Sequence, residues 1–155
     1  MKFDETDRKI LALLLENGRI SFADIGRQVG LSLPAASERV RRLEEAGIIE
    51  GYQAKLNLTA LGYPTLVYVL LSIVPNSYQA VLKQIEAIPE ILEACHVAGD
   101  WSLILKVRIA QMADLEPILY KLNRNGQSKS IVVLSQLVDK DLSGLVKVAS
   151  DKKIK

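Results

Sequence analysis

The chain has 155 residues, of which 49% are hydrophobic and 25% charged, and its formal net charge is +2. This length suits one ordinary domain or two small domains with separate cores. No uninterrupted apolar run approaches the roughly 20 residues that a bilayer crossing requires. The charged residues 1–9 are also unlike a secretory signal. The sequence therefore indicates a cytoplasmic protein without a membrane partner.

Histidine and cysteine are too scarce for several common chemistries. The chain contains one histidine, His96, and one cysteine, Cys95. A metal site, a Cys-His pair or a Ser-His-Asp triad would have to use these two residues, and no glycine-rich phosphate loop is present. We therefore expect no enzyme, no cofactor and no metal. Cys95 is expected to be a small buried side chain, and His96 a hydrogen-bonded core or interface residue.

Apolar residues recur at helical spacing over the first 50 residues and predict three helices. The residues expected to cap and end them, in chain order, are Asp4 and Asn17-Gly18, Ser21 and Gly30, and Ser32 and Gly47. Two short helices joined by a glycine-containing turn, the second with a polar outer face, are the layout of a helix-turn-helix. The third helix would then be the recognition helix.

Three arginines lie close together on this third helix. They fall mainly off its predicted apolar stripe, which consists of Leu33, Ala36, Val40 and Leu43. Outward guanidinium groups in a major groove could bind guanine or neutralise phosphates. Pairing of the arginines with Glu38, Glu44 or Glu45 on a solvated helix is the alternative. The candidate DNA-binding residues are Ser32, Pro34, Ala35, Ser37, Glu38, Arg39, Arg41 and Arg42.

The next segments suggest where one domain ends and another begins. Residues 48–54 alternate enough to form a short strand or wing. Residues 55–63 are interrupted by turn-forming residues, including Asn57 and Gly62, which indicates a hinge. We expect a winged helix-turn-helix domain over residues 1–54 and a second domain over residues 64–155.

The second half of the chain shows a repeated order of strand, helix and strand. Strands are predicted over residues 65–74, 91–97, 102–109 and 131–138, with helices near 81–88 and 115–122. This is the βαββαβ order of the ferredoxin-like α+β architecture. The first strand is apolar on both faces, and the two helices cover only one face of the sheet. We therefore expect the other face to form a homodimer.

The loop Gly99-Asp100-Trp101-Ser102 joins the two middle strands and holds the only tryptophan of the chain. Its backbone amides and Asp100 could bind a small zwitterion. The residues alone equally allow a plain hairpin with Trp101 packed at an interface.

Several motifs in register resemble the leucine-responsive regulatory protein/AsnC (Lrp/AsnC) family of transcription factors. They lie at residues 4–11, 17–21, 29–32, 39–49, 61–62, 88–91 and 98–101. The resemblance implies a winged helix-turn-helix, a hinge and a sensing domain that dimerises through its sheet and often assembles into octamers. It also implies amino-acid binding near the contacts between dimers.

The resemblance extends to the candidate effector-binding residues, which are Gly99, Asp100, Trp101, Ser102 and Ser130. Family members usually carry an aspartate where this chain has Ser102, so the second carboxylate of the loop is missing here. The expected function is that of a sequence-specific DNA-binding regulator modulated by an amino acid or a related small molecule.

Two alternatives come from other functional classes. One is an enzyme similar to the siroheme decarboxylases, which also resemble this family. The other is an effector-independent assembly module that has lost DNA binding. A single histidine beside an intact third helix argues against the first, and the arginine cluster argues against the second.

Overall fold

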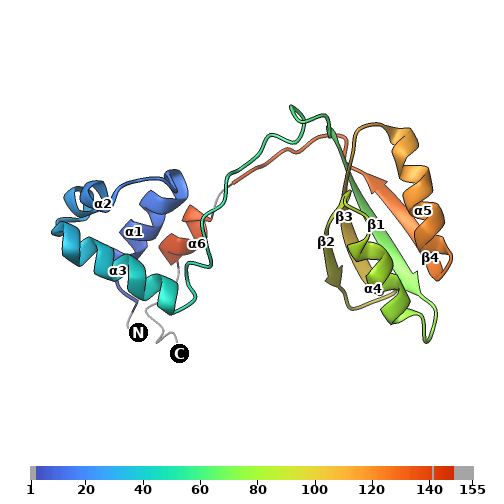
Figure 1. Ribbon diagram of the computed structural model, residues 1–155, viewed down its shortest axis with the longest axis horizontal. Helices are drawn as coiled ribbons and strands as arrows, with labels where there is room; N and C mark the ends of the chain where they lie inside the picture. Colours follow the sequence, from blue (N-terminus) through green and yellow to red (C-terminus); the bar gives the residue numbers. More distant parts are fainter. Residues whose placement is uncertain (1–2, 141, 149–155) are drawn as a thin grey trace. The chain divides into compact units, whose positions relative to one another are not determined.

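The computed structural model describes residues 3–140 and 142–148. The chain divides into two compact units, which Figure 1 displays. The N-terminal unit comprises the residues up to Lys55 together with the chain from Val138 onward, and the sheet unit comprises Leu56–Leu137. Among the described helices, none is both long and apolar enough to span a membrane.

Three helices form the body of the N-terminal unit: α1 (Glu5–Glu16), α2 (Phe22–Val29) and α3 (Leu33–Glu45). The predicted caps are confirmed. The Asp4 side chain accepts from the Asp7 amide, Ser21 from the Asp24 amide, and Ser32 from the Ala35 amide. Each cap satisfies a backbone donor that the first helical turn leaves free. These local bonds explain why the three helix starts could be predicted closely.

The helices bury one apolar core between them. Its fully or nearly fully buried members are Phe3, Ile10, Leu11, Ile25, Ala36, Val40 and Leu43. The expectation that Leu33 belongs to this core is wrong, because its side chain is 53% exposed. Leu33 is the first residue of α3, one turn before Ala36 and Val40 bring the helix against the core.

A close approach between backbones shapes the turn that precedes α3. The Leu31 amide donates to the Gly26 carbonyl over 2.8 Å. A Cβ atom at Gly26 would lie 2.6 Å from the Leu31 carbonyl oxygen. Gly30, which ends α2, has a φ of 72°, in the left-handed region that favours glycine. Two glycines therefore set how α3 follows α2.

The segment after α3 does not form the predicted strand. Residues 50–57 have no regular secondary structure, because none of the described strands pairs with them and an isolated strand is not stable. The chain from Val138 onward also departs from the predicted domain bounds, since it groups with the N-terminal unit. There, α6 (Ser143–Val148) contacts α1, and Val146 packs against the core. An ion pair of 3.0 Å joins Lys55 Nζ to Asp139 Oδ2.

The sheet unit confirms the predicted βαββαβ order. Its elements are β1 (Thr65–Ile73), α4 (Tyr78–Glu86), β2 (Ile91–His96), β3 (Leu103–Ile109), the 3₁₀ turn η1 (Met112–Asp114), α5 (Leu115–Asn123) and β4 (Gly126–Val132). The strand order across the sheet is β2-β3-β1-β4, and all neighbouring strands are antiparallel. The fold class is therefore α+β, as expected.

Side-chain alternation gives this sheet a covered face and an open face. On the covered face, Val67, Val69 and Leu71 of β1 are fully buried in one core with Val81 of α4 and Leu122 of α5. The open face carries the alternate residues, which are half-buried. They include Leu66, Tyr68 and Leu70 of β1 and Ile104, Lys106 and Arg108 of β3. No described element buries the open face fully.

The predicted bounds of the last strand are wrong. The prediction followed the apolar residues 131–138, whereas β4 runs over the more polar Gly126–Val132. The bounds of β4 are set by its antiparallel pairing with β1, in which Ile73 lies opposite Gly126 and Val67 opposite Val132. A Cβ atom at residue 126 would lie 1.9 Å from the Ser72 carbonyl oxygen, so glycine suits this start. Beyond the strand, Leu134 and Leu137 are more than 90% exposed.

Candidate nucleic-acid interface and effector loop

The outer surface of α3 carries most of the candidate DNA-binding residues. Ser32, Pro34, Glu38, Arg41 and Arg42 are exposed, Ala35, Ser37 and Arg39 are half-buried, and Ala36, Val40 and Leu43 are buried on the opposite side. The polar outer face that a recognition helix needs is present. The three arginines on it differ in what they contact.

Arg39 binds the N-terminal end of α1. Its Nη1 donates to Asp4 Oδ1 and Oδ2 over 2.9 and 2.8 Å, and to Asp7 Oδ1 over 2.8 Å. The side chain of Asp7 is only 4% exposed and that of Arg39 27%. The expectation that Arg39 turns outward is therefore wrong. Asp4 and Asp7 reach it from another helix, which a periodicity argument within α3 cannot reveal.

The pKa values at this cluster follow from its contacts. Hydrogen bonds to Asp4 and then to Asp7 raise the pKa of Arg39 above its ordinary value. Burial raises the pKa of Asp4, but the hydrogen bonds from Arg39 and the Asp7 amide outweigh it, so that the pKa lies below its ordinary value. The charges of Arg39 and Asp4 are therefore retained at neutral pH, and the hydrogen bonds of Arg39 to Asp4 and Asp7 join α3 to α1.

Arg41 is exposed but paired with acidic neighbours on its own helix. Its Nε and Nη2 donate to the Glu38 carboxylate over 2.7 to 3.0 Å, and its Nη1 donates to Glu45. The hydrogen bond from Arg41 lowers the pKa of Glu38. This is the pairing that the solvated-helix alternative predicted. An anion would have to displace or join these carboxylates to reach Arg41.

Arg42 is the third arginine of the set. It is exposed, and its guanidinium makes no hydrogen bond or ion pair among the described residues, although its charge contributes to lowering the pKa of Glu38. A guanidinium in this condition keeps all five donors for an external acceptor. Of the three arginines, Arg42 is thus the one that can bind a phosphate or a base without breaking an internal contact.

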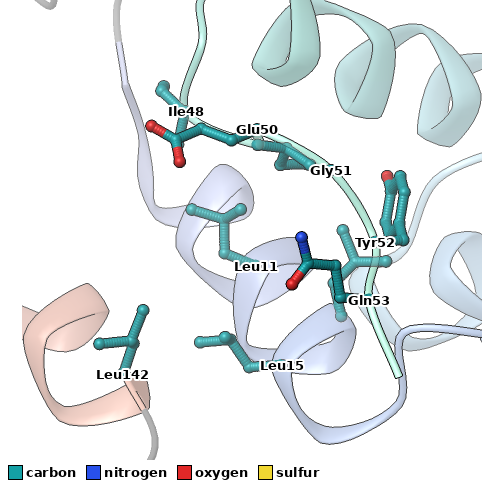
Figure 2. A pocket seen from close by; sticks show the side chains of 10 residues that line it. Leu11, Leu15, Ile48, Glu50, Gly51, Tyr52, Gln53 and Leu142 are labelled. Carbon is teal, nitrogen blue, oxygen red and sulfur yellow. The ribbon is translucent and has the colours of Figure 1, made fainter. Parts of the chain in front are cut away.

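The segment that follows α3 is held to the same helix. Tyr52 donates its hydroxyl to Glu44 Oε1 over 2.8 Å, and burial together with this bond raises the pKa of Tyr52 to about 12. Between the segment and α1 lies an apolar groove of about 560 Å³. Figure 2 shows Leu11 and Leu15 of α1 facing this groove, with Leu142 also on its border. The segment is thus held beside α3 without forming a strand.

The candidate effector loop connects β2 to β3. Gly99 has a φ of 123°, Asp100 is exposed and Trp101 is half-buried. Ser102 makes hydrogen bonds to β1. Its amide donates to the Leu71 carbonyl over 2.9 Å, and its Oγ accepts from the Ile73 amide over 3.2 Å. Asp100 is consequently the carboxylate that the loop offers to a ligand.

Ser130 does not lie beside this loop. It sits on β4 opposite Val69, so its side chain is on the helix-covered face, and β1 separates β4 from β3. Two strand spacings amount to about 10 Å. The structure brings Ser102 against the end of β1, but it does not bring Ser130 to the loop.

Cys95 differs from its expected surroundings, and His96 does not lie in the core of the sheet unit. Both are exposed on β2. The Cys95 thiol donates to Glu93 Oε1 over 3.3 Å, and this bond raises its pKa. The His96 ring lies 5.6 Å from the ring of Tyr78. β2 is an edge strand, so Cys95, which was predicted to be buried, lies at the surface of the protomer. No group of side chains suited to a metal ion occurs among the described residues.

Two family models match the chain, one for each part. Residues 3–50 match a winged helix-turn-helix DNA-binding model, and residues 66–142 match the Lrp/AsnC ligand binding domain. The HTH-type transcriptional regulator Rv2324 of Mycobacterium tuberculosis is 38% identical over 146 residues, which cover 90% of this chain and 97% of that protein.

Solved structures agree with these matches. LrpC of Bacillus subtilis superposes with a TM-score of 0.85 at 29% identity, over 90% of this chain and all of that one. The feast or famine regulatory protein Rv3291c of M. tuberculosis, solved with L-methionine, superposes with a TM-score of 0.78 at 29% identity. The superposition covers 88% of this chain and 95% of that one. Together these features define a DNA-binding transcriptional regulator with a ligand-binding domain. The chain belongs to the Lrp/AsnC family.

Proposed function

We propose that α3 enters the major groove of DNA and that Arg42 contributes the main cationic contact. The observation that carries this proposal is the exposed Arg42 guanidinium without an ionic partner among the described residues. Residues at the start of a recognition helix approach base edges. Ser32, Pro34, Ala35, Ser37 and Glu38 are therefore assigned to the bases, and Arg41 and Arg42 to guanine or phosphate.

Glu38 and Arg41 act in this proposal as one unit. A glutamate in the major groove can accept from the N4 amino group of cytosine, and an arginine can donate to guanine. Because Glu38 and Arg41 already bind each other, contact with DNA exchanges one set of bonds for another. We therefore assign Arg41 a smaller share of the binding energy than Arg42. Arg39 positions α3 and does not contact DNA.

The open face of the sheet is assigned to a homodimer. Leu66, Tyr68, Leu70, Ile104 and Ile131 lie on this face and are incompletely buried, and two copies packed face to face would cover them. A dimer would place two α3 helices in successive major grooves, about 10 bp apart. Dimers would then assemble further, up to an octamer.

The effector is assigned to the loop Gly99-Asp100-Trp101-Ser102, with Ser130 supplied by another protomer. The distance between Ser130 and the loop within one chain supports a shared site between protomers. The L-methionine complex of a similar protein supports an amino acid as the ligand. Because the Ser102 hydroxyl holds the end of β1, Asp100 would bind the ammonium group.

A thermal-shift screen with the twenty amino acids tests the effector assignment, because a ligand that binds only the folded state raises the unfolding temperature. At least one amino acid should raise it, and Asp100→Asn should abolish the shift. An unchanged shift in this variant would contradict the role of Asp100.

Selection from random DNA duplexes, followed by footprinting, tests the DNA assignment. The enriched duplexes should contain two half-sites whose centres lie about 10 bp or a multiple of this spacing apart. Failure to enrich any sequence would contradict sequence-specific binding.

A regulator of transcription acts where the chromosome lies, so residence in the cytoplasm is part of the proposal.

A further inference from the structure

A second cavity lies in the sheet unit, far from the loop Gly99-Asp100-Trp101-Ser102. It measures about 250 Å³ and is lined by Leu58, Tyr63, Pro89, Glu90, Leu92 and Arg108. Arg108 lies near the end of β3 and Ser102 just before its start. Arg108 is six positions beyond Ser102 along extended chain, which is roughly 20 Å. The cavity is therefore at the opposite end of the sheet from the candidate effector loop.

The guanidinium of Arg108 is only partly satisfied. Its Nη1 donates to the Pro64 carbonyl over 3.1 Å and to the Tyr63 carbonyl over 3.5 Å. Its Nε is buried and has no hydrogen-bond partner in the described part of the chain. An unpartnered buried donor costs free energy. Arginine nitrogens donate in pairs to the two oxygens of a carboxylate, so a carboxylate that entered the cavity and reached Nε would satisfy this donor.

Glu90 supplies the opposite charge at the same cavity. Its carbonyl accepts from the Arg108 amide over 2.9 Å, so the two residues are neighbours across the sheet. Their side chains nevertheless form no ion pair, and within the described residues the Glu90 carboxylate has no other cation partner. An unpaired carboxylate beside a partly free guanidinium can bind the two charged ends of one molecule.

The remaining walls of the cavity are apolar. Leu58, Leu92 and the ring of Tyr63 offer contacts to an aliphatic group, and Pro89 carries no side-chain donor. Cavities for drug-sized ligands measure about 300 to 1,000 Å³, so this one suits a smaller molecule. We propose that the cavity is a second ligand site, which binds a small zwitterion with an aliphatic body. Arg108 binds its carboxylate and Glu90 its ammonium group.

Occupancy would act on the segment that leads into β1. Leu58 and Tyr63 belong to a turn in which the Leu61 amide donates to the Asn57 carbonyl and the Tyr63 amide to the Leu58 carbonyl. Arg108 binds the last residues of this segment. A ligand that contacts Leu58, Tyr63 and Arg108 together therefore restrains the connection between the two units.

The test is an NMR titration of the full-length protein with leucine methyl groups labelled, in which Leu58→Ile and Leu92→Ile assign the two signals. The probes are L-leucine, L-leucinamide, which lacks the carboxylate, and 4-methylpentanoate, which lacks the ammonium group. L-Leucine should shift the Leu58 and Leu92 signals, and L-leucinamide should bind at least tenfold more weakly. Trp101 fluorescence reports binding at the other loop separately.

Two variants and one matched control complete the test. Arg108→Gln should weaken the binding of L-leucine at least tenfold, whereas Lys121→Gln, at an exposed position of α5, should leave the affinity for L-leucine unchanged. Glu90→Gln should weaken the binding of L-leucine and leave the affinity for 4-methylpentanoate unchanged. The proposal is overturned if L-leucine perturbs Trp101 but neither Leu58 nor Leu92, or if L-leucinamide binds as tightly as L-leucine. Neither result depends on a variant that fails to fold.

Discussion

At the scale of single residues, Arg39, Arg41 and Arg42 have the same charge on the same helix but different surroundings. Arg39 binds two aspartates of α1, Arg41 binds two glutamates of α3, and Arg42 makes no ion pair in the part of the chain that the structure describes. Removing a partner from a buried ion pair is expensive, whereas exposed pairs contribute little. Stability and DNA binding should therefore depend on different arginines.

Arg39→Met should lower the free energy of unfolding by about 3 kcal/mol, because Asp7 would be left buried without a cation. Arg42→Met, on the exposed face, should change it by less than about 0.5 kcal/mol. Urea unfolding at pH 7 measures both values. Equal effects of the two substitutions would contradict the role assigned to Arg39.

The pKa of Asp4 lies below its ordinary value of 3.8. Its charge therefore stabilises the folded state fully above about pH 4, and this contribution is lost as the pH falls through the lowered value. Asp4→Asn keeps a good helix cap but removes the charge. It should destabilise the protein by about 1 kcal/mol at pH 7, since Asp4 is partly solvated, and by less at pH 2.5. A loss independent of pH in urea unfolding would contradict this.

The sequence predicted the charges on α3 but not the partners of each. Asp4 and Asp7 were recognisable as helix-capping residues, since capping is local and its spacing is fixed. Their contact with Arg39 joins residues more than 30 positions apart, which no local pattern specifies. The pair Asp4 and Asp7 at the start of α1 was the available signal, since two carboxylates close together favour a cation nearby.

At the scale of elements, the turn between α2 and α3 depends on backbone atoms that approach each other closely. Gly26→Ala would place a methyl group 2.6 Å from the Leu31 carbonyl oxygen, so the turn must shift. Overpacking of this kind costs about 1 to 3 kcal/mol. Thermal unfolding should show a loss in this range, and the DNA affinity should fall because α3 moves.

Gly18→Ala is the matched control for this substitution. A Cβ atom there would lie 3.8 Å from the Leu14 carbonyl oxygen, an ordinary contact. Its effect on the unfolding temperature should be near zero. If both substitutions were tolerated equally, the close approach at Gly26 would not determine the turn.

The three helices of the N-terminal unit, α5 and the first three strands were predictable within one or two residues. In contrast, α4 begins three residues earlier than predicted, α6 was not predicted, and residues 48–54 do not form the expected strand. The caps and alternation of the predictable elements are properties of the sequence itself. β4 was not predictable in this way, because its polar residues owe their strand conformation to pairing with β1. The apolar residues 131–138 continue beyond the strand, and their exposure shows that hydrophobicity alone did not mark its end.

At the scale of the whole molecule, the open face of the sheet is the proposed dimer interface. Tyr68→Glu would place a charge in its centre, so the dimer should dissociate, and a single α3 per molecule should bind DNA more weakly. Tyr120→Glu on α5, where the tyrosine is 73% exposed, should leave the dimer intact. Sedimentation equilibrium measures the molecular mass of each variant and so distinguishes a monomer from a dimer. A Tyr68→Glu variant that stays dimeric would exclude this face as the interface.

The path of the chain after β4 was also missed. A linear reading assigned everything after the hinge to the second domain, but the chain returns to the N-terminal unit at Val138. The short α6 carries too few residues for a periodic signal, and its contact with α1 is non-local. Two connections therefore join the sheet unit to the helices that hold α3, rather than one hinge.

Regulation by this protein depends on α3 meeting DNA through the guanidinium groups that the fold leaves outward. Fluorescence anisotropy with a selected duplex, measured over a range of salt concentrations, tests this most directly. Arg41→Ala/Arg42→Ala should bind at least about tenfold more weakly, and the slope of log K against log salt should be shallower by about one or two. Arg124→Ala in the sheet unit should match the wild type. A double variant with unchanged affinity and salt dependence would contradict the central claim.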